Sequence, residues 1–166
     1  MLIKDEFLRA AIARTLQLKE EEIDEKAMER LVSLSARSAG IISLEGLDTA
    51  VNLQYLDLCG NSIEDLDLIK DLREVEYLNL SKNMLRDIQA LRGYRQLWRL
   101  DISRNNLYTM DISAIAGMIN LEELNLERSK VDNLVYLENA KKLHKLYISI
   151  ENGPFPLSIL GTLNEL

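Results

Sequence analysis

The sequence is poor in the residues that build disulfide frameworks, metal centres, linkers and aromatic cores. Its single cysteine, Cys59, excludes an internal disulfide and a cysteine-based zinc site, and its single histidine, His144, lies in no catalytic or metal-binding motif. Two prolines and seven glycines leave no tract typical of a linker, and only 5% of the residues are aromatic. A hydrophobic core is therefore expected to consist mainly of leucine and isoleucine.

Charge and hydropathy exclude further classes of protein. No apolar run reaches the roughly 18 residues of a membrane span, so no membrane insertion is expected. The segment from Met1 to Glu6 lacks the apolar stretch of a signal peptide, so the protein is expected to stay in the cytoplasm, or else to be a secreted or surface protein whose signal was removed. The net charge of −7 argues against nucleic acid as the partner, because such binding depends on neutralising phosphates.

The dominant feature is a repeat of the form Leu-x-x-Leu-x-Leu-x-x-Asn-x-Ile, whose copies start at positions 31, 53, 75, 97, 121 and 143. The alternating Leu-x-Leu portion predicts a short strand with one buried face, and the asparagine predicts a turn whose amide bonds the backbone of the neighbouring coil. The spacing leaves little room for a long helix on the return path, so 3₁₀ or extended segments are expected there. The sequence thus predicts an α/β leucine-rich-repeat fold, a right-handed solenoid with a parallel concave β-sheet.

Residues 1–30 are expected to form a helical N-terminal cap, and residues 31–166 the leucine-rich repeats. The pattern of residues 4–18 predicts an amphipathic helix. Asp24 is expected to be the N-cap of a second helix. The apolar face of the first helix is predicted to consist of Phe7, Leu8, Ala11, Ile12 and Leu16. At the other end apolar residues recur at spacing three up to Leu166, which predicts a truncated C-terminal end, with a degenerate cap as the alternative.

The stretch from Ile23 to Leu66 resembles the cap and first repeats of bacterial internalin-like leucine-rich-repeat proteins. The matching features are the helical cap, the segments 31–36, 40–47 and 52–58, and the turn 61–63. The resemblance implies a curved solenoid of a surface-displayed or secreted type that binds host or partner proteins through its concave face. The 22-residue spacing is also similar to that of the intracellular phosphatase regulator SDS22, so localisation and partner stay open.

No motif for catalysis or cofactor binding accompanies the repeats. The sequence contains no glycine-rich phosphate loop, metal-ligand cluster or nucleophile elbow. The acidic runs 20–22 and 64–67 lack the glycine of a calcium-binding EF-hand loop and are expected to be solvated. The chain is therefore predicted to be neither an enzyme nor a cofactor- or metal-binding protein.

The informative positions are those that the strands present outward. In a parallel, in-register sheet, equivalent residues stack about 4.8 Å apart, so Tyr55, Tyr77 and Arg99 are predicted to form one column. Asp57, Asn79, Asp101 and Asn125 are predicted to form the next column, with Trp98 beside Arg99 at the edge. The candidate partner-binding residues of the concave face are Arg37, Tyr55, Asp57, Tyr77, Asn79, Lys82, Trp98, Arg99, Asp101, Arg104, Glu123, Asn125, Arg128, Lys145 and Tyr147.

Charge is distributed unevenly along the chain. Residues 78–108 carry six basic and two acidic side chains within an acidic molecule. Arg86, Arg92, Arg95, Arg99 and Arg104 belong to this segment, with Arg92 and Arg95 expected on the return side. The primary hypothesis is a protein-binding module, a monomer or weak homodimer, whose partner has an acidic surface. The alternatives are a structural spacer in a larger surface protein, an SDS22-like regulatory subunit, and glycan or nucleic-acid binding through the arginines.

Overall fold

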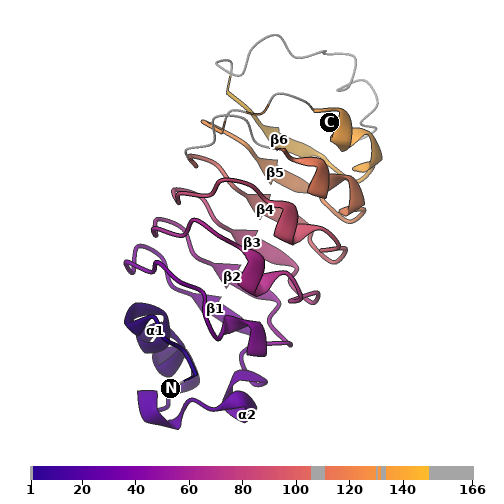
Figure 1. Ribbon diagram of the computed structural model, residues 1–166. Coiled ribbons are helices and arrows are strands. Elements are labelled where there is room, and N and C mark those ends of the chain that lie inside the picture. Colours follow the sequence, from indigo (N-terminus) through magenta and orange to yellow (C-terminus); the bar gives the residue numbers. More distant parts are fainter. Residues whose placement is uncertain (1, 106–110, 130, 132–133, 150–166) are drawn as a thin grey trace.

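The structure is a computed structural model that describes residues 2–105, 111–129, 131 and 134–149. Within these residues a short helical segment is followed by stacked coils, and each coil contributes one strand to a single parallel sheet in chain order (Figure 1). The strands are β1 (Ser33–Ser35), β2 (Tyr55–Asp57), β3 (Tyr77–Asn79), β4 (Arg99–Asp101), β5 (Glu123–Asn125) and β6 (Lys145–Tyr147). The register is regular, so that Leu34, Leu56 and Leu78 pair in succession.

Short 3₁₀ helices occupy the side of each coil opposite the sheet (Figure 1). They are η2 (Leu47–Thr49), η3 (Asp67–Ile69), η4 (Gln89–Leu91), η5 (Ser113–Gly117) and η6 (Val135–Asn139). The apolar residues of the repeat point inward from both sides, and each fully buried leucine contributes about 2 kcal/mol of hydrophobic stabilisation. The predicted leucine-rich-repeat solenoid, with a 3₁₀ convex side and a helical cap, is confirmed. The segment on which the predicted truncation depends, up to Leu166, lies outside the described residues.

One core position is occupied by an aromatic residue that the repeat pattern does not predict. Tyr94 is fully buried at the position that Leu72 and Met118 occupy in the neighbouring coils. Its hydroxyl donates a hydrogen bond to the backbone carbonyl of Ile69, at the end of η3. Burial raises the pKa of the Tyr94 hydroxyl, so the group remains a neutral donor, and the hydrogen bond offsets the cost of burying it.

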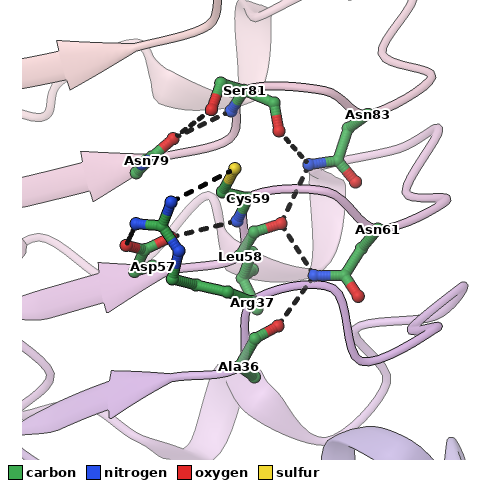
Figure 2. A network of polar contacts seen from close by, with 9 residues as sticks. All are labelled: Ala36, Arg37, Asp57, Leu58, Cys59, Asn61, Asn79, Ser81 and Asn83. Atoms are coloured by element: carbon green, nitrogen blue, oxygen red, sulfur yellow. Dashed lines mark hydrogen bonds and ion pairs between the residues drawn. The ribbon is translucent and has the colours of Figure 1, made fainter.

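An amide ladder of the buried residues Asn61, Asn83 and Asn105 runs through the turns that follow the strands. Figure 2 shows the part of the ladder that Asn61 and Asn83 form. The Asn61 side chain donates to the carbonyls of Ala36 and Leu58, at 2.9 and 2.7 Å. The Leu58 carbonyl also accepts from Asn83, at 3.0 Å. The Leu58 carbonyl is thus shared by the asparagine of its own coil and that of the next coil.

The ladder continues and ends in the same manner. Asn105 donates to the carbonyls of Leu80 and Ile102, and the Ile102 carbonyl accepts from the Ser129 hydroxyl at 2.8 Å. The side-chain oxygen of Asn83 accepts the Ile63 N–H of the preceding coil at 3.1 Å. The predicted role of the repeat asparagine, as both donor and acceptor toward neighbouring backbone, is therefore confirmed.

The N-terminal cap is formed by α1 (Glu6–Leu16), the 3₁₀ helix η1 (Glu20–Glu22) and α2 (Glu25–Met28). The helix α1 is shorter than the expected 4–18, because it ends at Gln17 in a left-handed conformation. Asp24 caps α2 by accepting the Ala27 N–H at 2.7 Å, as predicted. Phe7 is wrongly predicted to be buried. Its side chain is 48% exposed because it lies at the border of the packed face, over Gly40.

Asp5 connects the cap to the first coil. One carboxylate oxygen accepts the N–H groups of Phe7 and Leu8 and so caps α1. The other oxygen accepts the N–H groups of Ile42 and Ser43, at 2.9 and 3.1 Å. Burial raises the pKa of Asp5, but these backbone hydrogen bonds outweigh it and hold the pKa below its ordinary value of 3.8. Among the described residues no helix is long and apolar enough to cross a membrane.

Replacing Asn83 by alanine should lower the free energy of unfolding by about 2–3 kcal/mol, because the buried Ile63 N–H loses its acceptor. Asn83→Ser should cost less, since Ser129 holds the equivalent position in the chain. Urea denaturation measures both values. Asn139→Ala removes an exposed side chain and is the control, with a change within about 0.5 kcal/mol. Equal effects at positions 83 and 139 would contradict the structural role of the ladder.

Asp5→Asn should keep the helix cap but break the link to Ile42 and Ser43, at a cost of about 1 kcal/mol, whereas Asp5→Ala should cost about 2 kcal/mol. Because the folded-state pKa of Asp5 is lowered, its stabilising contribution is present above the unfolded pKa. It is lost as the pH falls through the folded pKa. The difference in unfolding free energy between wild type and Asp5→Asn should therefore shrink between about pH 5 and pH 2, and a constant difference would argue against this.

Candidate protein-binding surface

A continuous side-chain stack lies on the concave face of β2, β3 and β4. The rings of Tyr55 and Tyr77 are stacked, with centroids 4.3 Å apart and planes 11° apart. The guanidinium carbon of Arg99 lies 5.5 Å from the Tyr77 ring centroid, and Trp98 lies against the same ring at 6.1 Å. These four residues are called the concave stack, and the predicted column of Tyr55, Tyr77 and Arg99 is confirmed by the register.

Charged residues extend this column beyond Arg99. Arg99 pairs with Glu123 at 3.2 Å, and Glu123 also contacts the ammonium group of Lys145. The hydrogen bond from Lys145, together with the nearby positive charges, holds the pKa of Glu123 below its ordinary value. Burial and the neighbouring Tyr55 raise the pKa of Tyr77, so its hydroxyl is neutral. The column thus changes along the sheet from aromatic to alternately charged.

The second column contains Asp57, Asn79, Asp101 and Asn125, in the predicted register. Each side chain accepts the backbone N–H two residues later, which turns the chain out of the strand. Carboxylates alternate with amides, so no two like charges are directly stacked. Asn125 donates to Asp101 at 3.2 Å.

Two members of this column are not free surface groups. The Asp57 side chain is 1% exposed and binds Arg37 at 2.8 Å, while Arg37 covers it from solvent (Figure 2). Asn79 is also buried and accepts from the Ser81 N–H and hydroxyl. The expectation that both face outward for a partner is corrected here, because their side chains fold back to satisfy the turn.

A basic strip borders the concave face where the chain leaves the strands. It consists of Lys82, Arg104 and Arg128, which are all exposed and have φ angles of 56°, 56° and 54°. This left-handed conformation costs a residue with a side chain about 1–2 kcal/mol. Arg104 and Arg128 line an open hollow of about 620 Å³ together with Met84 and Arg86.

The other predicted site residues are more dispersed. Asp101, Glu123 and Asn125 are half-buried, whereas Lys145 and Tyr147 are exposed on β6. The five arginines of the basic segment do not share one surface. Arg86 pairs with Glu64 at 2.7 Å, and Arg92 bonds Gln89 and Ser113 on the convex side.

The candidate metal-ligating and nucleophilic residues of the described part of the chain do not gather into a cluster. No group of three or more histidine, cysteine, aspartate or glutamate residues there could hold a metal ion. Cys59 is buried, with its sulfur 3.9 Å from an Arg37 nitrogen. The His144 ring contacts the Lys142 carbonyl at 3.2 Å.

The shared left-handed backbone conformation of the basic strip is not among the features predicted from the sequence. A signal was available, because Gly60 occupies the equivalent position one coil earlier and has a φ of 74°. A glycine directly before the repeat asparagine indicates that the position requires a positive φ.

Comparison with known proteins supports the fold on independent grounds. Residues 51–107 match the leucine rich repeat family. The structure is similar to an internalin (inlF) from Listeria monocytogenes, with a TM-score of 0.92, 25% identity, and coverage of 99% of this chain and 48% of that chain. It is likewise similar to internalin C2 (inlC2) of the same organism, with a TM-score of 0.91, 27% identity, and coverage of 99% and 73%.

A more distant likeness shows the fold alone. It is to the plant peptide hormone receptor RGFR1 in complex with RGF2, with a TM-score of 0.71, 20% identity, and coverage of 83% of this chain and 24% of that one. No curated protein matches the chain in a sequence search. The chain spans about half the length of the inlF structure.

Proposed function

Because the chain is a leucine-rich-repeat protein of internalin-like architecture, we propose that it is a non-enzymatic module that binds a protein partner through its concave sheet. Leucine-rich-repeat domains are commonly protein-interaction modules, and stacked repeats provide the extended concave surface for that purpose. The observation that carries the proposal is the concave stack of Tyr55, Tyr77, Trp98 and Arg99.

The residue types of the stack suit a binding centre. Tyrosine, tryptophan and arginine dominate the energetics of protein interfaces, because they combine a large contact area with polar groups. Here the Tyr77 ring lies against Tyr55, Trp98 and Arg99 at once. These contacts limit rotamer freedom before binding, so less side-chain entropy is lost when a partner docks.

The residues around the concave stack are polar or charged and do not form a second apolar site. Arg99 is held by Glu123, which leaves the guanidinium positioned for a hydrogen bond to a partner carbonyl or carboxylate. Half-buried Asp101 and Asn125 lie in the adjacent column. A partner surface with an apolar or aromatic centre and a polar border fits this arrangement. The plant receptor in complex with RGF2 shares the fold, so a leucine-rich-repeat solenoid of this type is compatible with binding a partner.

A double substitution, Tyr77→Ala with Arg99→Ala, should strongly weaken partner capture and leave the fold intact, since neither residue belongs to the buried core. The measurement is quantitative pull-down by the immobilised protein, with circular dichroism to check folding. Loss of two central interface side chains typically lowers affinity at least about tenfold.

The matched control is Tyr136→Ala with Arg95→Ala, which removes the same residue types away from the concave sheet. Trp98 provides a second readout, because it is the only tryptophan and lies within the stack. Binding at this site should change its fluorescence. Partner capture that survives the concave double substitution, or that leaves the Trp98 fluorescence unchanged, would refute the concave site.

A further inference from the structure

The turns after β1 to β5 each place one residue in the left-handed conformation, at the same position in successive coils. These residues are Ser38, Gly60, Lys82, Arg104 and Arg128, with φ angles of 49°, 74°, 56°, 56° and 54°. Glycine or asparagine adopts this conformation most readily. Three adjacent coils instead carry a long basic side chain there. Strained backbone conformations are retained mainly at functional sites, so their recurrence with basic side chains indicates that these side chains have a functional role.

The geometry of the turns aligns the backbones of the three residues. The Lys82 N–H donates to the Ser103 carbonyl, and the Arg104 N–H donates to the Glu127 carbonyl, at 2.9 and 2.8 Å. The turns therefore stack in the register of the sheet, with equivalent residues about 4.8 Å apart. Lys82, Arg104 and Arg128 thus form a straight basic strip across three coils.

The positive charges of the strip are not neutralised within the described part of the chain. Arg99 and Arg86 pair with Glu123 and Glu64, but no carboxylate there pairs with Lys82, Arg104 or Arg128. Glu127 precedes Arg128 in the chain, but none of the ion pairs among the described residues joins these two side chains. Three like charges at this spacing repel one another, so the strip is an electropositive edge that an anionic ligand would stabilise.

The basic strip also borders a hollow in the surface. Arg104 and Arg128 line the hollow of about 620 Å³, and Met84 contributes an apolar side chain to it. Met84 is 53% exposed, and its flexible thioether adapts to the aliphatic part of a ligand. Glu64, Asn83 and Asn105 complete the lining, and Glu64 is already paired with Arg86. A ligand at this position therefore meets the free cations of Arg104 and Arg128 and the apolar side chain of Met84.

We propose that the basic strip binds an extended acidic peptide segment of the partner protein, which crosses the coils roughly perpendicular to the strands. Guanidinium groups bind carboxylates in a planar, two-pronged geometry. In an extended peptide, side chains on one face recur about every 7 Å, so about two carboxylates cover the roughly 10 Å length of the strip. A long polyanion such as nucleic acid fits less well, because the strip is short and the whole chain carries a net charge of −7.

This inference rests on the proposed function, since the strip borders the concave face, and it adds the chemistry of the partner. Its test removes the charges without straining the turn. The triple variant Lys82→Asn, Arg104→Asn and Arg128→Asn places at each position a residue that favours the left-handed conformation. The fold should therefore be as stable as wild type in thermal denaturation.

The probe is a fluorescein-labelled peptide of alternating glutamate and threonine, followed by fluorescence anisotropy. Wild type should bind it, with an affinity that falls as salt is added. The triple variant should bind about tenfold more weakly, because each exposed ion pair contributes only modestly. Arg95→Asn, which removes one exposed arginine from the return segment, is the matched control and should bind like wild type.

Three results would overturn the acidic-peptide site. They are no binding of the peptide by wild type, equal binding by the triple variant, and tighter binding of single-stranded DNA than of the peptide. The variant Tyr77→Ala with Arg99→Ala separates the two proposals. It should keep most of its affinity for the acidic peptide even where it no longer captures the partner, and failure of the strip leaves capture through the concave stack untouched.

Discussion

The structure depends on how the backbone of the buried turns is satisfied. The turn that follows each strand passes through the interior of the solenoid, where an unpaired backbone N–H or carbonyl would be costly. The amide ladder meets this demand, because the Leu58 carbonyl accepts from both Asn61 and Asn83, and the Leu80 carbonyl from both Asn83 and Asn105. Every shared carbonyl ties one coil to the next. The interaction therefore fixes the stacking of the coils as well as the local turn, and the leucine core fills the space that the stacking defines.

Fixed stacking has a chemical consequence. A residue type that recurs at one position of the repeat forms a column, in which equivalent residues of neighbouring coils lie about 4.8 Å apart. Most columns of this chain avoid repeated charge. The second concave column alternates Asp57, Asn79, Asp101 and Asn125, and the first passes from Tyr77 through Arg99 to Glu123 with opposite charges adjacent. The basic strip departs from this rule. Its members are stacked like charges on an unfavourable backbone conformation, which is why the strip indicates a ligand more strongly than a scattered set of surface arginines does.

The repeat spacing was sufficient to predict the strands, the 3₁₀ return segments and the concave columns, because all three follow from periodicity within one coil. The features that escaped prediction depend on contacts between coils. Tyr94 is buried because the Ile69 carbonyl of the preceding coil accepts its hydroxyl. Asp57 is buried because Arg37, from the coil before, lies over it. Asp5 joins residues 37 and 38 positions later in the chain. Neither residue type nor local sequence pattern reveals such pairings. A strand residue that the alternating pattern predicts to be exposed can therefore be buried and inaccessible to a partner.

The two surface features place different demands on a single partner. The concave stack lies near the beginning of strands β2 to β4, and the basic strip lies beyond the ends of strands β3 to β5. The sheet between them is held rigid by in-register pairing and by the amide ladder, so the separation of the two features is set before any partner arrives. A rigid surface with an aromatic centre and a displaced positive edge loses little entropy on binding and admits one orientation of a partner that carries an acidic segment. Under the proposed function, the concave stack would supply most of the affinity for the partner, and the basic strip would set the orientation of the partner.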